Sequence, residues 1–123
     1  MTRSLILTTI LLFVTLMPHH ALAVNLESHR WKHRVLIVTA RSLADITYQR
    51  QAAELMAAFS DLLVRDMVLE SEFGHPEFSI VLIGKDGTEK LRRNRPITAA
   101  EIFAVIDAMP MRQAEMRSEQ SNP

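Results

Sequence analysis

The chain has 123 residues, with 14 basic and 14 acidic side chains and hence no formal net charge at pH 7. A balanced charge gives no electrostatic reason to expect a nucleic acid or an anionic membrane surface as partner. The sequence contains no cysteine, which excludes disulfides, thiol redox chemistry and metal binding through sulfur.

The first 23 residues have the three parts of a secretory signal. Arg3 supplies a positive charge, residues 5–17 form an uncharged apolar run, and Ala21-Leu22-Ala23 is a small-residue cleavage site. The apolar run is shorter than the roughly 20 residues that a membrane-spanning helix needs. We therefore predict a signal peptide over residues 1–23, cleaved after Ala23, and a periplasmic or secreted protein with no membrane span after cleavage. The alternative is an uncleaved N-terminal anchor.

The next part of the chain predicts a strand, a helix and a second strand. Val35 to Ala40 is a continuous apolar run, which is typical of a central strand covered on both faces. Ser42 stands three residues before Asp45, as in a capping box, and predicts a helix that begins near Leu43. A short strand follows over 65–70. The helical residues whose spacing of three and four predicts a core-facing stripe are Tyr48, Ala52, Leu55, Met56, Phe59, Leu62 and Leu63.

The second half predicts a hairpin and a helix. A buried-type strand over 78–83 ends in a strong turn signal, Asp86-Gly87, and an edge strand follows over 88–92. Thr98 opens a full capping box, and Pro110 ends the helix that begins there.

This order of elements, βαβ followed by ββα, is the minimal core of a thioredoxin-like domain. We predict an α/β fold with about four strands and two main helices. The domain would span residues 24–112, and the polar residues 111–123 would be frayed, with 113–123 forming a C-terminal tail. The residues predicted to form the core are Val35 to Val38, Phe59, Ile80, Leu82, Phe103 and Ile106.

Four runs of the sequence are together similar to the motifs of a known family. The runs are Arg30-Trp31-Lys32-His33-Arg34-Val35-Leu36, Leu63-Val64-Arg65-Asp66, Leu82-Ile83-Gly84-Lys85-Asp86-Gly87 and Ile106-Asp107-Ala108-Met109-Pro110-Met111-Arg112. They resemble a domain of unknown function found in short exported bacterial proteins, with a related domain in vertebrate extracellular proteins that carry sushi repeats. That family is considered related to peroxiredoxins and thioredoxins. The resemblance therefore implies the same fold and no particular activity.

The comparison with thioredoxins also bears on the start of the first helix. Their reactive cysteines lie there, where the helix dipole lowers the thiol pKa, whereas this chain has Arg41 and Ser42. Neither side chain can replace a thiolate, so the resemblance implies a site without redox activity. Arg41, Ser42 and free backbone N–H groups could instead hold a small anion; the alternative, which we favour, is that Ser42 caps the helix and Arg41 is solvated. Pro76 is a further candidate, because in this fold a proline before the third strand, often cis, faces the helix start.

Other candidate sites have weaker signals. Arg65 and Asp66 enter a strand and form a candidate binding pair, with a salt bridge or loop anchor as the alternative. His29 and His33 have a spacing that metal sites use, but the three cations beside them disfavour a metal. We predict no metal, no cofactor and no catalytic residue from any sequence pattern.

Two functions remain open from the sequence. The first is a non-catalytic binding or structural module of the cell envelope, whose partner is a protein or a small ligand. The second is an enzyme with a non-thiol site around Arg41, Ser42 and Pro76 that uses a bound cofactor.

Overall fold

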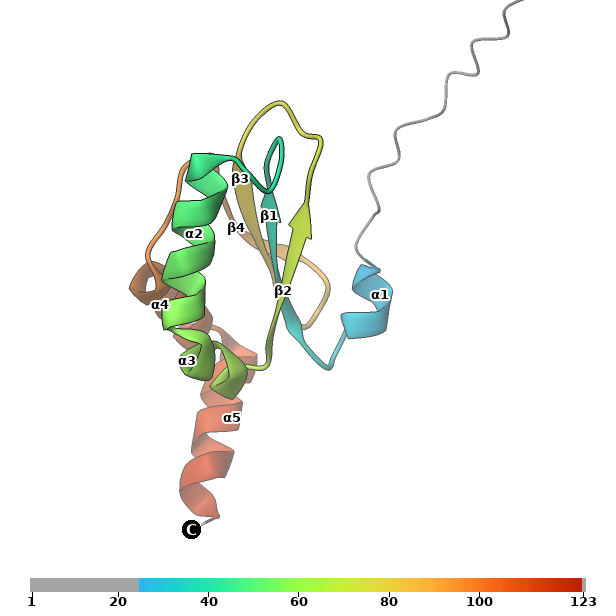
Figure 1. Ribbon diagram of the computed structural model, residues 1–123. Helices are drawn as coiled ribbons and strands as arrows, with labels where there is room; N and C mark the ends of the chain where they lie inside the picture. Colours follow the sequence, from blue (N-terminus) through green and yellow to red (C-terminus); the bar gives the residue numbers. More distant parts are fainter. Residues whose placement is uncertain (1–24, 123) are drawn as a thin grey trace, which may run out of the picture.

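The computed structural model describes residues 25–122, which form a four-stranded sheet with helices packed against it (Figure 1). The strands are β1 (Arg34–Thr39), β2 (Met67–Glu72), β3 (Ser79–Ile83) and β4 (Glu89–Arg93). The helices are α1 (Leu26–His29), α2 (Ile46–Ala57), α3 (Phe59–Val64), α4 (Ala99–Asp107) and α5 (Pro110–Ser121). None of these helices is long and apolar enough to cross a membrane. The predicted signal peptide lies outside the described residues.

The topology confirms the predicted thioredoxin-like α/β fold. The strand order is β2-β1-β3-β4, with β1 parallel to β2 and antiparallel to β3, and with β4 antiparallel to β3. The two strands with continuous apolar runs, β1 and β3, are therefore the central ones. The parallel strands β1 and β2 are joined by α2 and α3, and the antiparallel strands β3 and β4 are joined by the predicted hairpin.

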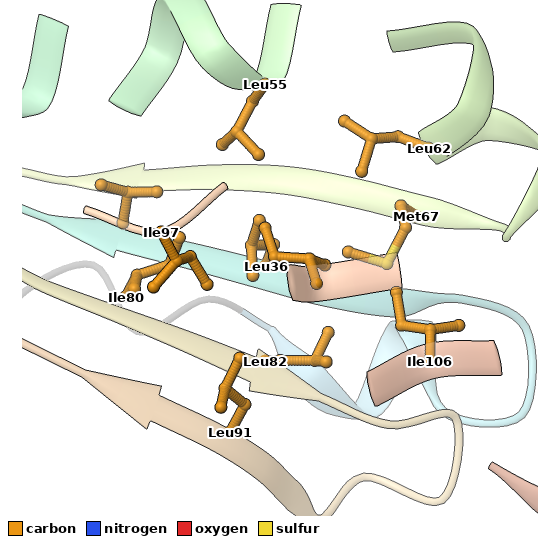
Figure 2. Close-up of a cluster of buried hydrophobic side chains, with 11 residues drawn as sticks. Leu36, Leu55, Leu62, Met67, Ile80, Leu82, Leu91, Ile97 and Ile106 are labelled. Carbon is orange, nitrogen blue, oxygen red and sulfur yellow. The ribbon is translucent and has the colours of Figure 1, made fainter. Parts of the chain in front are cut away.

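The main core lies on one face of the sheet, under α2, α3 and α4 (Figure 2). Leu36 and Leu82 are opposite each other on β1 and β3 and are fully buried. Of the predicted core residues, Leu36, Val38, Ile80, Leu82 and Ile106 belong to this cluster, and Phe103 packs against it while half-buried. Val35 and Ile37 point to the opposite face, because side chains alternate along a strand. We call that side the open face, and α1 is the helix that contacts it.

The prediction of one continuous first helix with one buried stripe is wrong. The residue Ala58 has non-helical dihedral angles and separates α2 from α3. Leu55 and Leu62 are two turns apart and point into the core, whereas Phe59 is exposed. The predicted stripe was wider than the face that the sheet covers, so Phe59 is not a core residue.

The predicted start of the first helix is also wrong. The N-cap of α2 is Asp45, whose Oδ1 accepts hydrogen bonds from the backbone N–H groups of Thr47 (2.8 Å) and Tyr48 (3.2 Å). Ser42 lies in a turn before it, and its carbonyl accepts a bond from the Asp45 N–H. Both residue types are good caps, and the Ser-x-x-Asp pattern therefore left two possible starts. The cap predicted for α4 is confirmed, since Thr98 Oγ1 accepts a bond from the Glu101 N–H.

The hairpin between β3 and β4 has the predicted turn. Gly87 adopts φ 81°, a left-handed conformation that glycine tolerates without strain. Asp86 accepts bonds from the side chain of Lys90 and from the backbone and hydroxyl of Thr88. These bonds, led by the one from Lys90, lower the pKa of Asp86 to about 2.

The prediction that the C-terminal residues are frayed is wrong, because most of them form a helix. The helix α4 ends at Asp107, three residues before Pro110. Pro110 is the first residue of α5, which continues to Ser121. Proline suits this position because the first N–H of a helix has no intrahelical partner and the ring fixes a helical φ. α5 thus runs through the boundary predicted at residue 112, and Arg112 on it is buried.

Candidate functional site

A groove lies on the open face of the sheet and continues over the loop before β3. Two adjoining hollows of about 500 and 440 Å³ form it. The four polar residues that line both hollows are Thr39, His75, Ser79 and Arg92. The floor beneath them is apolar, because Ile37, Val81 and Ile83 alternate onto this face from the two central strands.

The polar side chains at one end of the groove lie in two neighbouring pairs. The hydroxyl groups of Thr39 and Ser79 hydrogen-bond to each other, because the register places these residues opposite one another on β1 and β3. His75 Nε2 lies 3.3 Å from Oε2 of Glu72. The rim therefore offers hydroxyls that both donate and accept, and a carboxylate beside an imidazole.

Arg92 and Glu89, which are both on β4, line the groove along the edge of the sheet. The guanidinium donates from Nε (2.7 Å) and Nη2 (2.9 Å) to the two carboxylate oxygens of Glu89. These bonds lower the pKa of Glu89 below its usual value. Both side chains are exposed, so this edge presents a donor and an acceptor together.

The structure brings Arg41 and Pro76 together at the rim of the groove. Arg41 Nε donates to the carbonyl oxygen of Pro76 over 3.0 Å, and Pro76 lines the larger hollow. No cis peptide bond occurs within residues 25–122. Ser42 is exposed in the adjacent turn and does not line either hollow. The carboxylate of Asp45 takes two N–H groups at the helix start on which an anion site would depend.

Arg65 and Asp66 lie at the opposite end of the sheet and do not pair with each other. Arg65 donates to both carboxylate oxygens of Asp107, at 3.0 and 2.9 Å, and its guanidinium lies 4.1 Å above the Phe103 ring centre. Asp66 accepts a 2.8 Å bond from Lys85 Nζ. Arg65 thus connects the turn between α3 and β2 to α4, and Asp66 connects the same turn to the turn that follows β3.

These anchors belong to a larger charge network that holds α5. Glu115 accepts two 3.2 Å bonds from the guanidinium of Arg34 and one of 2.6 Å from Lys85 Nζ. Arg34 is 1% exposed and Lys85 9% exposed, so this carboxylate neutralises two buried cations. Arg112, also buried, lies 3.4 Å from Glu115 and 3.6 Å from Asp107. It thereby links the two carboxylates. Together with Arg65 and Asp66, these residues form what we call the charge network.

The comparison with known proteins covers most of the chain. The family described as a domain of unknown function, DUF4174, matches residues 25–74 and 68–115. The chain belongs to this family. No curated protein matches the sequence. All four runs quoted at the outset lie within the matched residues. Each run of the DUF4174 domain contributes to the charge network, through Arg34, Arg65 with Asp66, Lys85, and Asp107 with Arg112.

Sequence reasoning missed two features of this DUF4174 domain. Glu115 was assigned to a frayed tail, because its partners Arg34 and Lys85 are 81 and 30 residues away and no local spacing relates them. The groove was missed for the same reason, because Thr39, His75 and Arg92 reach it from distant parts of the sequence. The alternation of β1 was the available signal for the groove, since it sets Ile37 and Thr39 on the face away from Leu36.

The candidate metal ligands are the histidines that precede β1. His29 and His33 do lie together, with their Nδ1 atoms 3.2 Å apart. Within residues 25–122, however, no three histidine, aspartate or glutamate residues gather closely enough to hold a metal ion.

The charge network predicts an acid-sensitive fold. Burial raises the pKa of Glu115, but the bonds from Lys85 and Arg34 outweigh this effect, and the pKa is lowered. Its stabilising contribution is thus complete above the usual glutamate value of 4.5 and is lost as the pH falls through the lower folded value. We expect acidification below pH 4.5 to reduce the free energy of unfolding more in the wild type than in Glu115→Gln. Urea unfolding on both sides of that pH measures this, and equal losses would contradict it.

Proposed function

We propose that this DUF4174 domain is a non-catalytic binding module of the cell envelope, which holds an extended segment of a partner protein in the groove. The observation that carries the proposal is the composition of the groove, with an apolar floor and a polar rim. Binding sites commonly combine apolar contact area with a few placed polar groups. The export signal predicted at residues 1–23 supplies the envelope part of the proposal.

The rim favours a peptide segment over a small anion. It offers hydrogen-bond donors from Arg92 and acceptors from Glu72 and Glu89, which match the N–H and C=O groups of an extended backbone. An anion would instead meet two carboxylates. The floor follows β3 for its five residues, a length of about 17 Å, which suits a peptide stretch of similar length.

The proposal predicts that the charge of Arg92 is needed for capture of the partner. Arg92→Glu reverses a charge that both hollows share, on an exposed side chain whose loss leaves the core intact. Hydrogen bonds to charged groups contribute about 1.5–3 kcal/mol, so we expect recovery of the partner from periplasmic extract to fall at least about tenfold. The matched control is Arg117→Glu, on the exposed side of α5.

The expected result is one stoichiometric partner that the wild type and Arg117→Glu retain and Arg92→Glu loses. Equal recovery by all three proteins, or no stoichiometric partner for the wild type, would contradict the proposed site.

One contact favours the alternative, an enzyme with a non-thiol site. Glu72 lies beside His75, and a carboxylate in that position can orient an imidazole for proton transfer next to the hydroxyls of Thr39 and Ser79. This alternative predicts turnover in a general hydrolase or oxidoreductase screen that His75→Gln abolishes. Such turnover would replace the binding proposal.

A further inference from the structure

The strand β2 forms one edge of the sheet, and no strand within residues 25–122 pairs with its outer side (Figure 1). Its inner side pairs with β1, and there the carbonyl of Glu72 accepts a bond from the N–H of Ala40. The backbone groups of alternate residues point to the same edge of a strand. The residues whose N–H and C=O groups point outward are therefore Met67, Leu69 and Ser71.

The strand β2 lacks the features that usually protect a sheet edge. Edge strands commonly carry lysines, prolines or bulges that prevent pairing with another strand. The other edge strand, β4, carries Lys90, Arg92 and Arg93, and its register with β3 is irregular. β2 contains no lysine, arginine or proline, and its register with β1 is continuous. The edge of β2 can therefore accept a further strand.

A hollow of about 150 Å³ lies beside this edge, between α2 and β2 on the helix-covered side of the sheet. Its lining includes Ala52 and Met56 of α2 and Leu69 of β2. Tyr48 also lines it, and the Tyr48 hydroxyl is held 2.8 Å from Oγ of Ser71. Because Met56 and Ser71 are exposed, the hollow is open to solvent. Side chains alternate between the two faces of a strand, so every second side chain of an added strand lies on the side of this hollow.

Acidic side chains on the opposite face of β2 indicate the kind of strand that fits. Glu70 and Glu72 are paired with Ile37 and Thr39 of β1 and therefore share the open face with them. Glu70 is half-buried and joins no ion pair within residues 25–122. Opposite charges on neighbouring strands stabilise a sheet, and like charges destabilise it. The edge thus favours a basic strand over a second copy of β2, which would bring its own glutamates to this face.

We propose that the outer edge of β2 binds an extended segment of a partner protein in which apolar and basic residues alternate. The segment adds a strand antiparallel to β2, the more stable direction of pairing. Its apolar side chains cover the hollow, and its basic side chains face Glu70 and Glu72. In such complexes the backbone bonds supply affinity, and the pockets for alternate side chains supply specificity.

The test is the binding of synthetic peptides to the wild type, followed by the NMR chemical shifts of the protein. The first peptide has six residues, the length of β2, with valine and lysine alternating and both ends capped. We expect saturable binding with a Kd below about 1 mM and shifts at β2 and α2. A peptide with glutamates in place of the lysines should bind at least about tenfold more weakly.

A third peptide tests the backbone contacts. In an antiparallel pair the two residues directly opposite each other exchange their backbone bonds and share a face. The valines therefore present their N–H groups to Leu69 and its outward-facing neighbours. Methylation of the valine backbone nitrogens removes these donors, and it should weaken binding at least about tenfold.

Two variants of the protein test the charge and the hollow separately. Glu70→Lys offsets the charge of Glu72, so the lysine and glutamate peptides should bind equally. Ala52→Leu fills the hollow and should weaken binding of the lysine peptide at least about tenfold. The matched controls are Glu119→Lys on α5 and Ala53→Leu on the exposed side of α2, and both should bind the peptides as the wild type does.

Several results would overturn this site. They are no saturable binding of the lysine peptide, equal binding of the three peptides by the wild type, or equal binding by Ala52→Leu and Ala53→Leu. Circular dichroism shows whether each variant is folded, and the comparison of peptides needs the wild type alone.

The site at the edge of β2 is distinct from the groove. Ala52 and Glu70 line neither hollow of the groove. Arg92→Glu, which should impair capture in the groove, should therefore bind the lysine peptide as the wild type does. Loss of peptide binding in Arg92→Glu, with shifts in the groove, would place the peptide there and overturn the edge site. The two proposals thus fail independently.

Discussion

Glu115→Ala should lower the free energy of unfolding by about 3–5 kcal/mol, the typical cost of removing one partner of a buried ion pair. The substitution leaves Arg34 without its carboxylate and Lys85 with Asp66 alone, and both cations are almost fully buried. A small domain has only about 5–15 kcal/mol of stability. In a domain of 60–100 residues each kcal/mol shifts the melting temperature by about 4–8 °C, so the loss should exceed 10 °C.

Glu119→Ala is the matched control for this prediction. Glu119 lies one turn further along α5 and 3.4 Å from Arg112, but its side chain is 59% exposed. An exposed pair contributes about 0–1 kcal/mol, so the melting temperature should change little. Similar shifts for the two variants, measured by thermal unfolding, would mean that the network does not hold α5.

Ile106→Ala should have the second large effect, a loss of about 2–5 kcal/mol. Ile106 is fully buried at the end of α4, in contact with the core of β1 and β3. Phe103→Ala removes more atoms, but Phe103 is half-buried with Arg65 over its ring. We therefore expect Phe103→Ala to be the less destabilising of the two.

Arg93→Ala provides the baseline for this comparison. Arg93 is on the edge strand β4, and its Nε lies 3.7 Å from Glu101. Surface substitutions of this kind usually change stability by about 0.5 kcal/mol or less. Urea unfolding should therefore rank the losses as Ile106→Ala, Phe103→Ala and Arg93→Ala. A larger loss for Arg93→Ala than for Phe103→Ala would mean that this edge of the sheet is more buried than the structure shows.

The sequence was sufficient for those parts of the fold that depend on neighbouring residues. The apolar run of β1, the Asp86-Gly87 turn and the Thr98 cap each have a local cause, and together they fix the order of strands and helices. The start of α2 was misplaced by three residues because Ser42 and Asp45 are both acceptable caps. The residue types alone do not distinguish these two caps. In the structure, the turn that begins at Ser42 places the start of the helix after Asp45.

The parts that the sequence did not predict depend on contacts between distant segments. Phe59 has the spacing of a core residue, but the width of the sheet decides that it is outside. Glu115 is polar and lies in a polar segment, and only the folded chain brings Arg34 and Lys85 to it. At the groove, Arg41 and Pro76 come together, whereas Ser42 does not line the groove.

The two charged residues of α5 in the network also determine the register of that helix. Arg112 and Glu115 are three residues apart and meet fixed partners in the domain. A slip of one helical turn, about 5.4 Å, would bring Glu119 towards Arg34, but it would also put Met116 where Arg112 lies. The thioether cannot pair with Asp107. Two contacts therefore set the position of the helix, and the misaligned packing would leave Asp107 with Arg65 as its partner but without Arg112.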